Sequence, residues 1–447
     1  MYKRLILLVF VAFSALWEAK AQGKLSLSQV DARTYELFIQ NDWEGLIREG
    51  TNALDQGIDY YYLRVRLGIA YFKMGKYHQA AKYFEGALDV NKEEYVQEYL
   101  YYSYLWSGRG SQAKLMALGF SPQMKIKTKT DQSKVLKGLE LAYNYTAITD
   151  QKVIDEFTAD VDPLAEGYQF IPRFHHYGFL GLDLDINSRF NLYQGFSVLQ
   201  ATQFYYSQDG DIPIQNTSYV SDSWQYYAGA SFYLGQGVHL SAGGHYLNIS
   251  YLQQQLVGVG NGQQTQLVSS TLKDSDFLVF GSISKNFMNL DLGATVYYGT
   301  INNGKQIQSD LNLTLFPLGN LNFYTFSVFT FQSQEFANTS SVNRFIFNQE
   351  IGAKVTGFLW LEGYGTFGEI ENYFTKQGLV VFNRLDKIEN RLGMRAIVLP
   401  HPNWKLTLDF SHFSNSSSFQ TPSEQTQEQN LKSYQLQSLT AILSWKF

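Results

Sequence analysis

The sequence SLTAILSWKF, residues 438–447, ends the chain on a nearly strict alternation of apolar and polar side chains. One face of a strand formed here would carry Leu439, Ala441, Leu443, Trp445 and Phe447. The other face would carry Ser438, Thr440, Ser444 and Lys446, with Ile442 as the apolar exception. Because side chains alternate across a strand, one face can meet an apolar medium while the other meets water. In a soluble sandwich the apolar face is a core, whereas in an outer-membrane barrel it faces lipid and the polar face lines the lumen.

The composition favours the membrane alternative. Aromatic residues make up 16% of the 447 residues and charged residues only 17%, against about 25% charged residues in typical soluble domains. The mean hydropathy is nevertheless −0.22, and no run of about 18 apolar residues follows the N-terminus, which excludes a transmembrane helix from the mature chain. Cysteine is absent, so disulfides and a thiol nucleophile are excluded. The net charge of −5 gives no reason to expect a nucleic-acid partner.

The N-terminus has the pattern of a secretory signal peptide, which we assign to residues 1–21. Lys3 and Arg4 precede an apolar run from Leu5 to Leu16, and Ala19-Lys20-Ala21 forms a small-x-small cleavage site. A membrane anchor is the alternative, but the apolar run is too short to cross about 30 Å of hydrocarbon as a helix. We therefore expect the mature chain to be exported.

Residues 25–120 have helical periodicity and one well-matched tetratricopeptide repeat. The matching positions are Leu67, Gly68, Tyr71, Gly75, Tyr77, Ala80, Phe84 and Ala87. In such a helix pair of about 34 residues, small residues let the helices touch and aromatic residues fill the seam. Degenerate copies flank the central one, as expected for a stack in which the outer repeats act as caps. We predict a small all-α domain here.

The first helix of each repeat would line a concave groove that binds a protein partner. The candidate groove residues are Tyr62, Val65, Ile69, Phe72, Tyr99, Ser103 and Trp106. The alternative is that these side chains form the core between repeats. Residues 121–137 are lysine-rich and are predicted to be a basic linker, either solvated or lying along inner-leaflet headgroups.

Residues 138–447 are predicted to form a transmembrane β-barrel of about fourteen antiparallel strands. The predicted strands are 138–148, 173–187, 190–206, 218–234, 237–253, 271–285, 288–301, 304–316, 320–333, 342–356, 358–370, 380–398, 403–414 and 431–447. Connections after even-numbered strands are short. Those after odd-numbered strands are long (149–172, 207–217, 254–270, 334–341, 371–379 and 415–430), except the tight turn at Asn302-Asn303. Short turns on one rim and long loops on the other are typical of outer-membrane barrels, and an even strand count places both ends of the barrel on the short-turn side.

Charged residues in the predicted strands gather on one face. Asp183 and Asp185 oppose leucines, and so do Arg391 and Arg395. A charge facing lipid at mid-membrane costs about 2–4 kcal/mol, so these side chains are expected in the lumen. Their mixed signs predict internal ion pairs rather than a strongly ion-selective pore.

A signal peptide, a tetratricopeptide module and a C-terminal barrel ending in an aromatic residue resemble the tetratricopeptide-containing outer-membrane proteins, of which exopolysaccharide-export proteins are familiar members. The resemblance implies an outer-membrane location in a Gram-negative bacterium, with the helical domain in the periplasm. It also implies that Phe447 is the terminal aromatic read by the barrel-assembly machinery. The repeat array and the barrel are shorter here than in those export proteins.

Catalytic and cofactor motifs are not found in the sequence, and we expect a protein that is not an enzyme and has no cofactor or metal. His239 and Ser241 share a strand face, a pair that outer-membrane lipid hydrolases use, but this spacing is common by chance. A lipid hydrolase is therefore a remote alternative, and two other roles remain open. One is a conduit or accessory for export, with polysaccharide as a candidate cargo and a periplasmic or outer-membrane protein partner on the helical module. The other is a non-conducting scaffold or assembly subunit, anchored in outer-membrane lipid.

Overall fold

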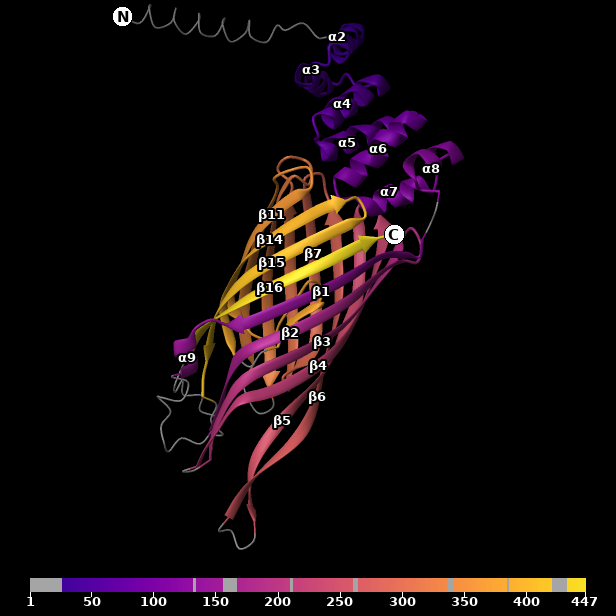
Figure 1. The fold of residues 1–447 in the computed structure, drawn as a ribbon. Helices are drawn as coiled ribbons and strands as arrows, with labels where there is room; N and C mark the ends of the chain where they lie inside the picture. The colour runs from indigo at the N-terminus through magenta and orange to yellow at the C-terminus, as the bar shows by residue number, and fades with distance from the viewer. Residues whose placement is uncertain are drawn as a thin grey trace, which may run out of the picture. The chain divides into compact units, whose positions relative to one another are not determined.

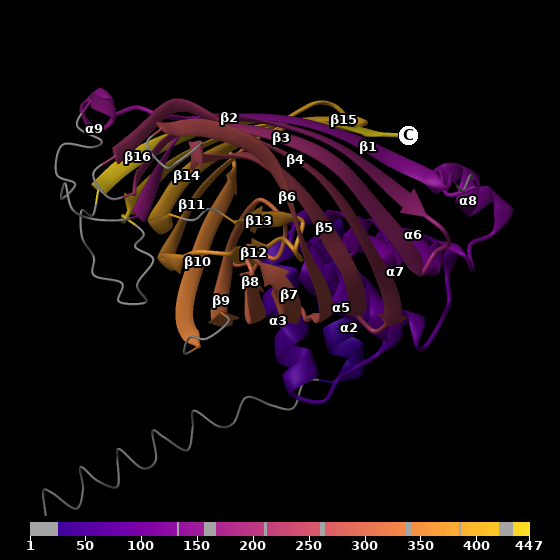
Figure 2. The same ribbon diagram turned by 90° about the horizontal axis from the view of Figure 1, so that it is seen from below.

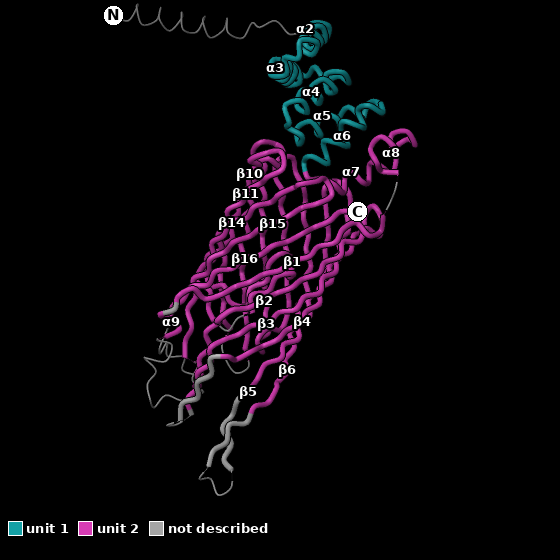
Figure 3. The backbone as a smooth tube through the Cα atoms, in the orientation of Figure 1, with its two compact units in different colours: residues 1–107 teal, residues 108–447 magenta. Residues whose placement is uncertain are grey.

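The computed structural model describes residues 26–131, 134–155, 167–209, 212–259, 264–336, 341–383, 386–419 and 432–447. The predicted signal peptide lies outside these residues. The chain folds into two compact units, one ending at Ser107 and one running from Gly108 to Phe447 (Figure 3).

The first unit is a series of antiparallel helices, each packed on the next along the chain. They are α2 (Leu27–Ile39), α3 (Trp43–Asp55), α4 (Tyr61–Lys73), α5 (Tyr77–Leu88) and α6 (Glu94–Trp106). Ser26 and Gln29 form a capping box at the start of α2, and the Asp42 side chain caps α3. These caps satisfy amide groups that would otherwise lack partners in the first turn of each helix.

Gly68 lets α4 and α5 pack closely. A Cβ atom at this position would lie 2.5 Å from the ring of Phe84, which is fully buried. Tyr71 on α4 stacks on Tyr83 of α5 with ring centroids 5.3 Å apart. The small residue and the aromatic residues of the repeat motif therefore meet in the seam of one helix pair.

The second unit begins with two more helices, α7 (Gly110–Ala117) and α8 (Pro122–Thr128). Helix α8 lies inside the range predicted as a linker, and its N-cap Ser121 and the following Pro122 explain why it starts there. Arg109 donates a hydrogen bond to the carbonyl of Phe287, and Lys114 pairs with Asp185. Both acceptors lie at short-turn ends of barrel strands.

Fourteen strands form a closed antiparallel barrel, as predicted (Figure 1). They are β1 (Leu136–Ile148), β2 (Gly167–Asp185), β3 (Phe190–Asp209), β4 (Ile212–Gly235), β5 (Val238–Val259), β6 (Gln264–Asn286), β7 (Leu290–Ile301), β8 (Gly304–Leu315), β9 (Phe323–Phe336), β10 (Val342–Lys354), β11 (Leu359–Ile370), β14 (Lys387–His401), β15 (Trp404–Ser417) and β16 (Lys432–Lys446). The barrel closes between β1 and β16, in a register that runs from Gly138 opposite Lys446 to Ile148 opposite Leu436. Closure pairs the backbone edges that an open sheet would expose to lipid.

Two predicted loops are wrong. The polar composition of residues 207–217 and 254–270 predicts loops, but β3 and β4 stay paired up to Asp209 opposite Ile212, and β5 and β6 up to Val259 opposite Gln264. A strand needs only about 9–11 residues to cross the bilayer. The extra length needs no apolar face, because ladder hydrogen bonds are made by the backbone whatever the side chains are.

The predicted strand 380–398 is also wrong. Residues 380–382 form β13 (Val380–Phe382), which pairs with β12 (Tyr373–Thr375) in a separate two-stranded sheet, and the barrel strand β14 begins only at Lys387. The apolar run Leu379 to Phe382 has the alternation and composition of a strand, so the sequence alone does not separate it from β14. The connection predicted as a loop at 371–379 is therefore half of a hairpin.

The two faces of the barrel wall differ as predicted. Leu311 on the outer face of β8 is 63% exposed, whereas its neighbour Asp310 on the lumen face is 5% exposed. Leu408 and Asp409 on β15 repeat this contrast. An exposed apolar band around a closed barrel identifies a membrane β-barrel. Among the described residues, no helix is long and apolar enough to span a bilayer.

Replacing Gly68 by alanine tests the helix seam. The added methyl group collides with the ring of Phe84, and such overpacking costs about 1–3 kcal/mol. We expect the melting of the helical signal in circular dichroism to shift several degrees lower in the full-length protein. Gly110→Ala on α7 is the control, because a Cβ there meets nothing within 4 Å. Equal melting of the two variants would contradict the seam.

Candidate functional site

The candidate site is the barrel lumen, which contains the β12–β13 hairpin (Figure 2). The hairpin leaves the wall where β11 ends at Ile370 and turns back at residues 376–379. At the tip, Lys376, Gln377 and Gly378 have φ angles of 51°, 56° and 78°. These left-handed conformations reverse the chain within the lumen.

One apolar cluster fixes the hairpin to the wall formed by β4 to β7. Phe374 is fully buried, and its ring lies 5.8 Å from that of Tyr297. The cluster also contains Tyr227, Leu278, Phe280 and Ile301, with Leu379 and Val381 of the hairpin packed against it. A Cβ atom on Gly378 would lie 2.4 Å from Leu278, so the tip approaches the wall as closely as a glycine permits.

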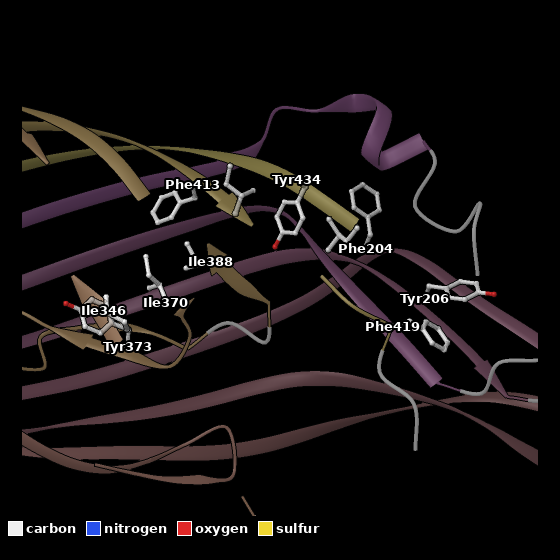
Figure 4. Packing of buried hydrophobic residues seen from close by; sticks show 11 residues of the cluster. Phe204, Tyr206, Ile346, Ile370, Tyr373, Ile388, Phe413, Phe419 and Tyr434 are labelled. Atoms are coloured by element: carbon white, nitrogen blue, oxygen red, sulfur yellow. The ribbon is translucent and has the colours of Figure 1, made fainter. Parts of the chain in front are cut away.

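A second apolar cluster holds the other side of the hairpin, toward the long-loop rim (Figure 4). Tyr373 is buried there with Ile370 and Ile388, and Phe382 packs against them. The ring of Phe382 lies 6.4 Å from that of Phe413 on β15. The guanidinium of Arg391 lies over the Phe382 ring, 5.7 Å from its centroid. The hairpin thus contacts walls on opposite sides of the lumen.

Glutamine side chains of the wall bind the hairpin through its backbone. The Gln308 amide donates to the carbonyl of Phe374 at 2.7 Å and accepts from its N–H at 3.0 Å. Gln306 donates to the carbonyl of Asn372 at 2.7 Å, and Gln332 donates to that of Glu371 at 2.9 Å.

Two further side chains hold the tip. His245 donates from Nδ1 to the carbonyl of Gly378 at 2.8 Å, and the Tyr227 hydroxyl donates to that of Gln377 at 3.3 Å. Side chains of the wall therefore bind several backbone polar groups of the hairpin, and its two strands pair with each other.

A charged network lies on the lumen face of β10, β11, β14 and β15. Arg395 stands in register between Asp409 and Glu362. It pairs with both, and with Glu350 at 3.3 Å. The Tyr364 hydroxyl donates to Asp409 at 2.7 Å. The predicted internal ion pairs are thus confirmed. Lys376 at the hairpin tip lies within electrostatic range of the same network.

The lumen side chains described above bind the hairpin. No group of metal-binding side chains occurs among the described residues. His239 and Ser241 both face the lumen from β5, and His239 lies against the ring of Tyr233 at 4.8 Å. In the described part of the chain no hydrogen bond joins His239 to Ser241. The hairpin and its glutamine contacts were missed at the sequence level, and the one available signal was the apolar run 379–382.

The predicted groove residues fall into three groups by exposure. Val65, Ile69 and Ser103 are buried in the helical unit. Tyr62 and Trp106 are exposed, at 55% and 44%. Phe72 and Tyr99 are half-buried, with ring centroids 4.9 Å apart, and Phe72 also lies 5.2 Å from Trp106. The structure thus brings Phe72, Tyr99 and Trp106 together and leaves Tyr62 apart from them.

Phe447 follows the last residue of β16. Its N–H donates to the carbonyl of Lys137 at 3.0 Å. The end of the chain is therefore hydrogen-bonded to the beginning of β1. Its exposed ring stacks on Trp445, which stacks in turn on Trp404 at 4.8 Å. The three rings form a continuous aromatic surface at the short-turn end of β15 and β16.

Comparison with known proteins gives only a likeness in fold. No family model matches the chain, and no curated protein matches its sequence. A Pseudomonas aeruginosa FadL homologue matches with a TM-score of 0.44 and 10% identity, over 70% of this chain and 90% of that chain. The P. putida toluene transporter TodX matches with a TM-score of 0.44 and 8% identity, over 74% and 94%. The translocator domain of the autotransporter NalP from Neisseria meningitidis matches with a TM-score of 0.30 and 7% identity, over 77% and 99%.

Removing the terminal ring separates assembly from stability. Phe447→Ala removes about 1.5–3 kcal/mol of apolar burial in lipid, a small loss for a barrel of this size. If Phe447 is also read during assembly, the amount of inserted protein in cells falls sharply while refolding in detergent stays normal. Membrane fractionation and detergent refolding measure the two effects. Normal insertion in cells would contradict the assembly role.

Removing Arg395 tests the charged network. Arg395→Met leaves Glu350, Glu362 and Asp409 with less compensation, and breaking a buried ion pair costs about 3–5 kcal/mol. We expect the folded band on semi-native gels to be lost at a clearly lower temperature. Lys305→Met, at an exposed position on β8, is the control and should leave that temperature unchanged. Identical behaviour of both variants would show that the network does not stabilise the barrel.

Proposed function

We propose that this protein is an outer-membrane transport barrel used for export, and that the β12–β13 hairpin closes its lumen at rest. The observation that carries the proposal is the way the hairpin is held. Side chains of the wall bind it, and its own ladder is internal, from Tyr373 opposite Phe382 to Thr375 opposite Val380. It can therefore leave the lumen as a unit without unpairing any barrel strand.

The strength of these contacts favours a closed resting state that can be opened. Each hydrogen bond between wall and hairpin contributes roughly 0.5–1.5 kcal/mol net, and the burial of Phe374 adds about 1.5–3 kcal/mol. A ligand or partner that reverses a closed population of 99:1 must favour the open state by about 5.5 kcal/mol. An ordinary protein–protein contact or a bound cargo can supply this amount.

The helical unit is proposed to lie in the periplasm and to bind a protein partner. It precedes β1, which starts at the short-turn rim, and short turns face the periplasm in outer-membrane barrels. The exposed side chains of Tyr62 and Trp106, with Phe72 and Tyr99 beside Trp106, form its candidate contact surface. Its assignment as a tetratricopeptide module is part of the same proposal. A polysaccharide cargo rests on the resemblance of the sequence alone.

Conductance measures whether the hairpin closes the lumen. In planar bilayers we expect the wild-type protein to be mostly silent. Replacing residues 371–382 by a Gly-Ser linker too short to reach the glutamine side chains should give steady conductance. This linker keeps the connection between β11 and β14 but loses the contacts of the hairpin with both apolar clusters and with Gln306, Gln308 and Gln332. Steady conductance of the wild type, or silence of the variant, would contradict closure by the hairpin.

A second candidate role is the non-conducting scaffold, which the occupied lumen also favours. Locking the hairpin distinguishes the two roles. The chain has no cysteine, and the Gln377 amide lies 3.5 Å from the Ser282 hydroxyl, so Gln377→Cys with Ser282→Cys can be joined by a short bifunctional thiol reagent. Loss of export in cells after crosslinking, with both single-cysteine variants unaffected, is expected for a conduit. Unchanged function of the locked protein would favour the scaffold.

A further inference from the structure

The lumen wall carries a row of amide side chains with the repeat of an extended polypeptide. Gln306 and Gln308 are two residues apart on β8 and face the lumen, so their side chains are spaced by about 6.6–6.8 Å. They bind Asn372 and Phe374, which are also two residues apart. The spacing of the wall side chains therefore matches the spacing of the backbone that they hold.

The contacts of this row are those of a β-ladder. A glutamine amide presents the same donor and acceptor as a peptide group. Gln308 both donates to and accepts from Phe374, as an antiparallel strand partner would. Gln332, which stands opposite Gln308 on β9, donates to Gln306 at 2.9 Å and extends the row to Glu371.

The row has an acceptor that the hairpin leaves unused. Gln332 is fully buried, and within the described residues no donor reaches its Oε1 atom. A buried amide oxygen without a partner is costly, and the missing donor is what a backbone N–H of a longer or shifted strand would supply.

We propose that Gln306, Gln308 and Gln332 form a binding site for extended polypeptide backbone, which the hairpin occupies at rest and a polypeptide cargo occupies after the hairpin leaves. This inference rests on the proposed function and names the class of its cargo. Recognition uses main-chain groups, so it does not depend on the side chains of the cargo. Wall and cargo exchange one set of amide contacts for another, which lowers the cost of opening.

Peptide binding to a barrel without its hairpin tests the site. The full-length variant with residues 371–382 replaced by the same short Gly-Ser linker is titrated with a fluorescent peptide of the sequence ENYFTKQGLVVF, residues 371–382. A scrambled peptide of the same composition and the saccharide cellohexaose are the other probes. Both peptides are expected to bind with similar affinity, because the glutamine row recognises the polypeptide backbone. Cellohexaose is not expected to bind.

The variant Gln306→Leu/Gln308→Leu/Gln332→Leu in the same background should weaken peptide binding by about tenfold or more, equivalent to about 1.4 kcal/mol. Gln225→Leu, on β4, is the matched control and should bind as before. The folded band on semi-native gels shows that each barrel is intact. Binding of cellohexaose alone, of the unscrambled peptide alone, or of peptides that the triple variant still holds would overturn the proposal. Conductance of the hairpin-less barrel, measured separately, decides the gating claim whatever the peptide result.

Discussion

The constraint on which the structure depends is that a chain crossing lipid must pair every backbone N–H and C=O within itself. The register between β1 and β16 meets it by closing the sheet, and closure sorts side chains into an apolar outer face and a lumen face. Inside the barrel the same need arises where side chains exclude water, as around the fully buried Phe374. The two strands of the β12–β13 hairpin pair with each other, and several of their remaining backbone groups are bound by glutamine, histidine and tyrosine side chains of the wall.

This arrangement has a functional consequence. A strand in the ladder is held by many cooperative backbone bonds and cannot leave without opening the barrel. A hairpin held by side-chain amides and two apolar clusters is bound firmly, yet its displacement leaves the wall intact. The charged network around Arg395 lies beside the tip, and its ion pairs are made between side chains of the wall. Closure and opening can therefore be properties of one short segment.

Much of the barrel could be predicted from the sequence because its signals are local. Alternation within β8, β14 and β16 predicts which side chains face lipid and which face the lumen. The difference between short and long connections predicts which turns share a rim of the barrel.

The incorrect predictions have a common cause. Polar strand extensions in β3 to β6 carry no alternation against lipid, and Val380–Phe382 has the pattern of a barrel strand although it pairs inside the lumen. The pairing partner of a strand depends on residues far away in the sequence, so the alternation of the strand itself does not predict it. Likewise Gln306 and Gln308 are ordinary lumen residues until the hairpin is placed against them. Val65, Ile69 and Ser103 are buried, which shows that repeat spacing alone does not distinguish residues of a binding surface from residues packed between helices.

Hydrogen exchange of the hairpin in detergent or lipid tests the central claim most directly. The amide of Phe374 donates to Gln308 at 3.0 Å inside a fully buried cluster. We expect peptides covering residues 371–383 to exchange as slowly as the barrel strands, and the Phe374 amide to be among the protected sites. Exchange of this segment at the rate of an exposed loop would contradict the account, because a hairpin outside the lumen could neither close it nor occupy the glutamine row.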